Sequence, residues 1–304
     1  VEYQIASGAI NAVTWAASFG DLLLGTTGSE YKATGDNGII TPKISYVTAQ
    51  SYWGSAGLAP LIIGNSVLHV QRHGSRVRDL FYSLEKDGYA GNDLSIFAPH
   101  LFDGHTLKQW AYQQTPGSTI WCVREDGLLL ALTYMKEHDI WGWSRHVTDG
   151  EVLSVATISG DDGDAVLLVV KRTINCSTKY YLERLADPFQ PSDDIAEAYF
   201  VDCGVSQRTT EPTQTVTGLA HLEGCTVSVL TDGSPVEGCV VTGGQISPLK
   251  AWKRTLPSAL TLPWTFPRPP RICGANPNAM RPCGQICALI RPCPRIWKLG
   301  CLRV

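Results

Sequence analysis

Residues 118–149 alternate short apolar runs with polar turns, as β-hairpins do. Gly127 lies in the first turn, where it can take a positive φ angle. Trp141 and Trp143 share one face of the third run, at the two-residue period of a strand. The four runs are residues 120–124, 128–134, 140–146 and 152–158. The pattern predicts four short antiparallel strands, the arrangement of one β-propeller blade.

The first apolar run of this stretch, which begins at Ile120, recurs along the chain. Apolar runs comparable to the one at Ile120 begin at Leu22, Val67 and Val166, so the starts are 45, 53 and 46 residues apart. A second run with aromatic residues follows three of them, at 80–82, 132–134 and 180–182. The period is close to the roughly 40–50 residues of known propeller blades. Any β-rich chain shows hairpins at similar intervals, but three units share both strand and turn position, which favours about four blade units.

One segment between these runs is the best candidate for a helix. Residues 92–101 can be capped by Asn92 or Asp93, although Pro99 limits the length of the helix. Long connections of this kind in a propeller often contact neighbouring blades or carry function.

The chain after the fourth repeat changes character. A strand is predicted at 198–205, and the polar residues that follow lack periodicity, which predicts a linker. Short apolar runs between glycine turns then predict a small β-barrel or sandwich module. The expected parts are propeller blades at 1–205, belonging to a larger propeller, a linker at 206–214, the small β module at 215–247 and a tail at 248–304.

The tail differs in composition from everything before it. Residues 248–304 hold ten Lys or Arg and no Asp or Glu, whereas residues 1–247 hold 15 basic and 28 acidic residues, a balance of −13. The tail also holds ten of the 18 prolines and five of the ten cysteines, without paired C-x-x-C spacing for zinc. The composition predicts an out-of-frame or disordered tail, irregular from about residue 257, with no metal and no functional residue.

Few residues form a pattern that catalysis would need. Asp161, Asp162 and Asp164 have oxygen ligands for calcium, but their spacing is not that of an EF-hand and favours an acidic turn. Asp193 and Asp194 are adjacent, so in a strand their carboxylates would point to opposite faces. We therefore expect no enzyme activity, no catalytic residue, no metal and no cofactor.

Aromatic and arginine side chains are the remaining candidates for binding. A sugar-stacking site could use Tyr52, Trp53, Trp110, Trp121, Trp141 and Trp143, but packing in the core is favoured. We expect the structural core to include Trp121, Trp141, Trp143 and Tyr134. Five arginines could contact phosphates or neighbouring subunits: Arg72, Arg76, Arg78, Arg124 and Arg145. The predicted subunit or channel contacts are four of them, Arg72, Arg76, Arg78 and Arg145.

Several long stretches of the chain resemble structural tail proteins of short-tailed bacteriophages, the tail-tube or nozzle proteins below the portal and connector. These stretches are residues 67–83, 88–104, 110–116, 121–134, 141–150 and 218–233. The resemblance runs from about residue 6 to residue 247. It implies a propeller with extra β modules, assembled as a ring, with a hexamer the expected size, around the genome channel.

The sequence thus predicts an all-β fold, with propeller-like repeats, a small β module and an irregular tail. The expected function is structural: a nozzle subunit that contacts other tail and connector proteins and lets viral DNA pass without tight binding. No apolar stretch is long enough for a spanning helix, so no membrane insertion is expected. The expected location is the virion tail, after assembly in the bacterial cytoplasm. The alternative is a glycan-binding or glycan-cleaving propeller that recognises the host surface.

Overall fold

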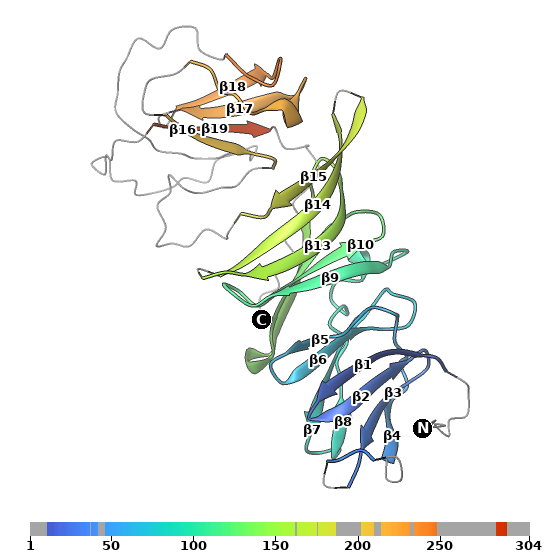
Figure 1. Cartoon of the computed structure of the whole chain (residues 1–304). Coiled ribbons are helices and arrows are strands. Elements are labelled where there is room, and N and C mark those ends of the chain that lie inside the picture. Colours follow the sequence, from blue (N-terminus) through green and yellow to red (C-terminus); the bar gives the residue numbers. More distant parts are fainter. Residues whose placement is uncertain are drawn as a thin grey trace. The chain divides into compact units, whose positions relative to one another are not determined.

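The structure is a computed structural model. It describes residues 11–36, 38–41, 46–161, 163–174, 176–186, 202–209, 214–231, 234–247 and 284–290. In these ranges the chain is all-β, as the sequence predicts, and forms five antiparallel sheets, none of them closed (Figure 1). The helices in the same ranges are single 3-10 turns.

The first three sheets are four-stranded meanders in which sequential strands are neighbours. The first contains β1 (Val13–Phe19), β2 (Asp21–Thr26), β3 (Glu30–Thr34) and β4 (Tyr46–Ser51). The second contains β5 (Leu61–Ile63), β6 (Ser66–Val70), β7 (Val77–Ser83) and β8 (Gly88–Ala90). The third contains β9 (Leu107–Gln113), β10 (Thr119–Arg124), β11 (Leu129–Met135) and β12 (Ile140–His146).

The predicted repeat is visible in the strand order. A fourth sheet contains β13 (Glu151–Ser159), β14 (Asp164–Ile174) and β15 (Ser177–Arg184). The expected starts at Leu22, Val67, Ile120 and Val166 fall on β2, β6, β10 and β14, the second strand of each successive sheet. The aromatic runs at 80–82, 132–134 and 180–182 fall on the third strands, β7, β11 and β15. The repeat of strand and turn positions is therefore confirmed.

The expected composition of the central meander is wrong in one strand. Residues 152–158 lie in β13, which joins β14 and β15 in the next sheet instead of pairing with β12. The fourth strand of the central sheet is β9, which precedes it and pairs with β10. The turn at 148–150 therefore separates two sheets and does not close a hairpin.

The expected helix at 92–101 is not formed. Pairing with β7 uses the backbone at its start: Asp79 N–H donates to Asn92 O (3.3 Å), and Leu94 N–H donates to Val77 O (2.9 Å). Only Pro99–Leu101 is helical, as a 3-10 turn with proline at its beginning. The backbone at the start of the segment is therefore committed to the sheet, and the residues after it form short turns, such as Ala98 N–H to Ser95 O (2.9 Å).

The chain divides into two compact units, and the division falls within β14. Unit 1 is residues 1–147 and 151–168, and unit 2 is residues 148–150 and 169–304. This division does not coincide with the expected linker at 206–214.

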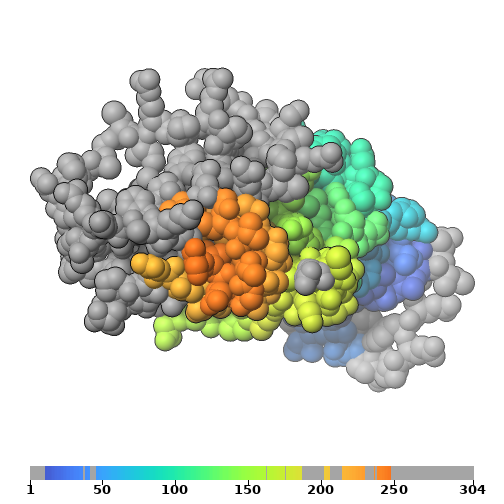
Figure 2. Space-filling view, turned by 90° about the horizontal axis from the view of Figure 1, so that it is seen from above, coloured from blue at the N-terminus to red at the C-terminus, as the bar shows by residue number. Residues whose placement is uncertain are grey.

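Unit 2 contains the fifth sheet, coloured gold, orange and red in Figure 1; the coloured parts of β17 and β18 are orange in Figure 2. Its order is β16 (Val205–Thr209), β19 (Gly284–Ile290), β17 (Thr226–Thr231) and β18 (Ser234–Val240). Residues 206–209, expected to start the linker, thus lie in strand β16. Residues 284–290, expected to be irregular, also form a strand, which pairs with β16 and β17. Their sequence GQICALI has no proline or charge and is rich in β-formers, which permits pairing despite the composition around it. The small β module therefore extends beyond 215–247 on both sides, and the other tail residues lie outside the described part.

Apolar side chains join the successive sheets of unit 1. Between the first two sheets, Trp15 and Leu23 pack with Val67, Leu80 and Tyr89. A larger core joins the second and third sheets through residues such as Leu68, Val70, Ile120, Leu130 and Leu132. Strand β13 in turn packs against β9 and β10. Each sheet is thereby covered by the next, which explains why β10 and β11 are buried along almost their whole length.

The predicted core residues divide into two pairs. Trp121 and Tyr134 are buried, with 6% and 1% of their surface exposed. Trp141 and Trp143 are half-buried and pack against the core from the edge strand β12. Because an edge strand has a neighbour on one side only, its side chains are covered less completely.

Candidate functional site

Two loops of unit 1 carry exposed aromatic and arginine side chains. We call residues 52–60, between β4 and β5, the aromatic loop, and residues 71–76, between β6 and β7, the arginine turn. In the aromatic loop, Tyr52 is 79% and Trp53 is 51% exposed. The exposed arginines of the turn are Arg72 and Arg76. Large aromatic side chains and arginine are the types enriched at the energetic centres of interfaces.

Backbone contacts hold the aromatic loop in place. Arg72 N–H donates to Gly54 O (2.9 Å), and Ser55 N–H donates to Thr26 O (2.7 Å). Gly54 has a φ of +72°, and a Cβ at this position would lie 2.4 Å from Thr27 O. Only glycine fits such a close approach at a positive φ. The two exposed aromatic side chains therefore project from a rigid support.

Arg78 supports the aromatic loop from within. Its guanidinium lies 3.7 Å from the centre of the Trp53 ring. Gln71 accepts a hydrogen bond from its Nε (2.9 Å), and Asp93 lies 4.0 Å from its Nη2. Burial lowers the pKa of Arg78, although the Asp93 charge opposes the shift. Arg78 is 7% exposed, so little of its side chain is open to the subunit or channel contact expected of it, which stays a prediction.

The other predicted arginines lie in different settings. Arg76 pairs with Asp93 at 2.5 Å while most of its side chain stays in solvent. Arg145 is exposed on β12 of the third sheet, whereas the arginine turn belongs to the second sheet. Arg124 is buried and donates to Leu101 O (2.7 Å), which makes it a structural residue.

Two of the tryptophans considered for sugar stacking are committed to the core. Trp110 donates through Nε1 to Ala59 O (2.7 Å), and Trp121 donates through Nε1 to Gln113 Oε1 (2.9 Å). Both are buried. Their rings are not available to a ligand, in contrast to Tyr52 and Trp53.

A buried polar cluster between the first two sheets was not predicted. Glu30 on β3 accepts hydrogen bonds from Ser51 Oγ (2.5 Å) and Ser55 Oγ (2.9 Å). His69 on β6 is fully buried, and its Nε2 lies 3.6 Å from Glu30 Oε1. Within the described part of the chain, neither ring nitrogen of His69 has a hydrogen-bond partner, and Trp15 Nε1 also lacks one. The signal in the sequence was a histidine inside an otherwise apolar run, 67–70.

Burial controls the ionisation of this pair. It lowers the pKa of His69 to about 3, with a further contribution from the charge of Arg78. It raises the pKa of Glu30, although the serine hydrogen bonds act in the opposite direction. His69 is consequently neutral near pH 7, and its contact with Glu30 is not an ion pair there.

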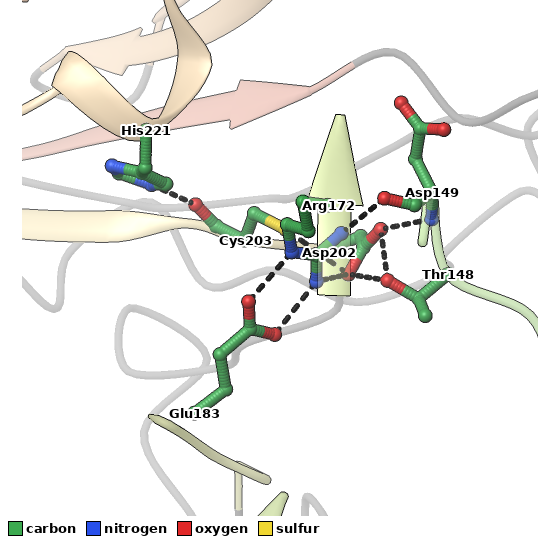
Figure 3. Close-up of polar contacts among 7 residues, drawn as sticks. All are labelled: Thr148, Asp149, Arg172, Glu183, Asp202, Cys203 and His221. Carbon is green, nitrogen blue, oxygen red and sulfur yellow. Dashed lines mark hydrogen bonds and ion pairs between the residues drawn. The ribbon is translucent and has the colours of Figure 1, made fainter. Parts of the chain in front are cut away.

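A second polar cluster lies in unit 2 (Figure 3). Arg172 on β14 is 4% exposed in its side chain and donates to both oxygens of Glu183 on β15, each at 2.6 Å. It also donates to Asp149 O (2.7 Å) and lies 3.4 Å from Asp202 Oδ1. Thr148 Oγ1 donates to the Asp202 carboxylate (2.8 Å). Burial alone would lower the pKa of Arg172, but these acceptors together raise it.

The same cluster contains the candidate metal ligands Glu183, Asp202 and Cys203, whose ligand atoms lie within 4.8 Å of one another. The guanidinium of Arg172 already occupies the position of the cation between the two carboxylates. Burial, and then the charge of Asp202, raises the pKa of the Cys203 thiol, whereas a metal requires the thiolate. The arrangement fits an internal ion pair better than a metal site.

Asp164, one of the aspartates considered for calcium binding, is also used internally. Asp164 accepts hydrogen bonds from the backbone N–H groups of Gln114 (2.7 Å) and Thr115 (3.1 Å), which lower its pKa. Asp162, Asp193 and Asp194 lie outside the described residues.

Comparisons with known proteins give no identification. No protein-family model matches the chain, and no curated protein sequence matches it significantly. Among the described residues, no helix is long and apolar enough to cross a membrane.

Proposed function

We propose that this chain is a structural virion protein, a subunit of a tail nozzle ring of a short-tailed bacteriophage. The observation that carries the proposal is the repeated strand order. In each of four successive sheets, the second strand contains one of the predicted repeat starts at Leu22, Val67, Ile120 and Val166. Consecutive four-stranded meanders that cover one another are the building plan of β-propellers. The sequence stretches that resemble nozzle proteins cover the second and third of these sheets and β17 of the fifth sheet.

The polar clusters of the described residues support a structural role. Arg172 neutralises Glu183 and Asp202, and Arg78 fixes Trp53. Glu30 and His69 lie fully enclosed between two sheets, where a substrate would not reach them. These groups stabilise the fold, while the exposed aromatic and arginine side chains are placed for contacts with other proteins.

The test is the assembly state of the purified protein. Mass photometry and negative-stain electron microscopy should show closed rings of one size with a central channel. A chain that stays monomeric at concentrations well above the micromolar range would contradict the proposal.

One observation favours a second candidate function, glycan binding. Tyr52 and Trp53 are consecutive and both exposed on one loop, and exposed aromatic rings can stack on sugars. A glycan array would test it, with the Tyr52→Ala variant as control. Sugar binding that this variant loses, by a protein that forms no ring, would replace the nozzle assignment with a receptor-binding role.

A further inference from the structure

We propose that the aromatic loop and the arginine turn of one copy bind the β7–β8 turn of the next copy, in a head-to-tail contact. This inference rests on the proposed ring and names the surfaces that build it. We call residues 84–87, between β7 and β8, the acidic turn.

The acidic turn presents an apolar side chain among charges. Leu84 is 85% exposed, which leaves almost its whole surface in water. Glu85 and Asp87 are exposed on either side of Lys86, so the turn carries a net charge of −1. Asp87 Oδ1 accepts a hydrogen bond from Tyr82 Oη (2.6 Å), which helps to fix the shape of the turn. An exposed leucine held beside carboxylates is suited to an aromatic and basic partner surface.

The two surfaces lie at opposite ends of one strand. The arginine turn leads into β7 at Val77, and the acidic turn leaves β7 after Ser83. Seven residues at about 3.3 Å each separate the two turns by roughly 20 Å. A surface that recognises a different surface at the far end of an identical molecule makes a heterologous contact. Such a contact closes into a ring when its rotation allows closure.

Charge complementarity makes a second copy the occupant. Arg72 and Arg76 form a local basic site on a chain whose residues 1–247 carry a balance of −13. Residues 1–247 of a second copy thus carry an excess of acidic residues, and the acidic turn adds an exposed leucine for the aromatic side chains. Phosphates would also attract the two arginines, but Leu84 and its carboxylates have no role in that alternative.

The aromatic loop loses little entropy on binding. Backbone hydrogen bonds to Thr26 and Arg72 hold it, and Trp53 is already stacked on Arg78. In the part of the chain that the structure describes, the Tyr52 phenol has no hydrogen-bond partner, so its substitution removes nothing from the fold. Preorganised aromatic side chains of this kind dominate interface energies.

The experiment uses two charge-reversed full-length variants. Variant A is Arg72→Glu with Arg76→Glu, and variant B is Glu85→Arg. Each alone should assemble at least about tenfold more weakly than the wild type in mass photometry, because like charges meet at every contact. An equal mixture should regain rings. The glutamates of A meet the arginine in B's altered turn, and the unchanged arginine turn of B meets the unchanged acidic turn of A. A contact with a different partner would not be repaired by mixing, and an isologous contact of the same two surfaces would be repaired as dimers and not as rings.

Three further measurements make the result specific. Lys108→Glu changes an exposed charge elsewhere in unit 1 and should assemble like the wild type. Tyr52→Ala should weaken assembly without lowering the unfolding midpoint. Anisotropy with a labelled single-stranded oligonucleotide should give equal, weak binding for the wild type and variant A.

The possible outcomes separate the inference from the proposed function. If the wild type forms rings and both variants do so equally well, the contact is wrong while the ring stands. If variant A loses assembly and mixing does not restore it, the acidic turn is not the partner surface and the inference fails. If the wild type forms no ring, the proposed function fails with it. Loss of oligonucleotide binding in variant A with rings intact would assign the arginines to nucleic acid and overturn the inference.

Discussion

At the scale of single residues, burial separates side chains that look equivalent in the sequence. Trp121 and Trp141 both lie in apolar strands, but β10 is an inner strand and β12 is an edge strand. Trp121 is 6% exposed and its indole N–H is hydrogen-bonded, whereas the Nε1 atom of the half-buried Trp141 has no partner among the described residues.

We expect Trp121→Ala to lower the free energy of unfolding by about 3–5 kcal/mol, as large core truncations do. Trp141→Ala should cost less than half of that, because part of its surface stays in water. Urea unfolding of the two variants measures the difference. Equal losses would mean that β12 is covered as fully as β10.

The buried His69 predicts a dependence of stability on acid. Its folded pKa of about 3 lies below the unfolded value, so between pH 6.5 and 3 the unfolded chain binds the extra proton. Stability should fall as pH falls through this window, by up to about 1.4 kcal/mol per pH unit. Glu30 opposes this loss. Its pKa is raised in the folded protein, so the folded state binds a proton at Glu30 more tightly than the unfolded chain does.

The measurement is the unfolding midpoint against pH for the wild type, His69→Gln and Glu30→Gln. The slope below pH 6.5 should be shallower in His69→Gln and steeper in Glu30→Gln. Identical slopes in the wild type and His69→Gln would show that His69 is protonated in the folded state.

At the scale of elements, ion pairs join strands to the segments beside them. Arg172 links β14 to Glu183 of β15, to Asp149 at the turn before β13 and to Asp202 just before β16 (Figure 3). All these groups belong to unit 2, so the cluster ties its chain segments together at one guanidinium.

Arg172→Leu should destabilise unit 2 by about 2–4 kcal/mol. The estimate is below that for a fully buried pair, because Glu183 and Asp202 retain some solvent. Arg172→Leu combined with Glu183→Leu should recover part of the loss by removing the unpaired carboxylate. Calorimetry of the two variants gives the comparison, and a double variant no better than the single one would contradict the role of Glu183.

At the scale of the whole molecule, the sequence predicted what depends on local periodicity. The four starts from Leu22 to Val166 fall on equivalent strands because turns and alternation are local properties. Packing between segments decides which strand lies at the edge of a sheet. The local pattern therefore placed residues 152–158, which lie in β13, in the wrong sheet. The candidate surface was half predicted: the arginines were named, but the burial of Arg78 against Trp53 depends on contacts between distant segments.

Charge gives a further expectation at this scale. A nozzle subunit of the kind proposed must release its cargo, and the acidic balance of residues 1–247 opposes binding through phosphates, which needs clustered Lys and Arg. We expect duplex DNA to bind residues 1–247 more weakly than about 1 µM at physiological salt. Fluorescence anisotropy over a salt series measures this, and tight binding that weakens steeply with salt would argue for a nucleic-acid-binding role.

The exposure of Trp53 has an optical consequence. Among the described tryptophans, Trp15, Trp110 and Trp121 are buried, and Trp53 is the most exposed. Collisions with iodide should therefore quench its fluorescence, and the anion should be drawn to the neighbouring arginines. A red-shifted, quenchable part of the emission should disappear in Trp53→Phe, and in the wild type it should become protected when the molecules assemble.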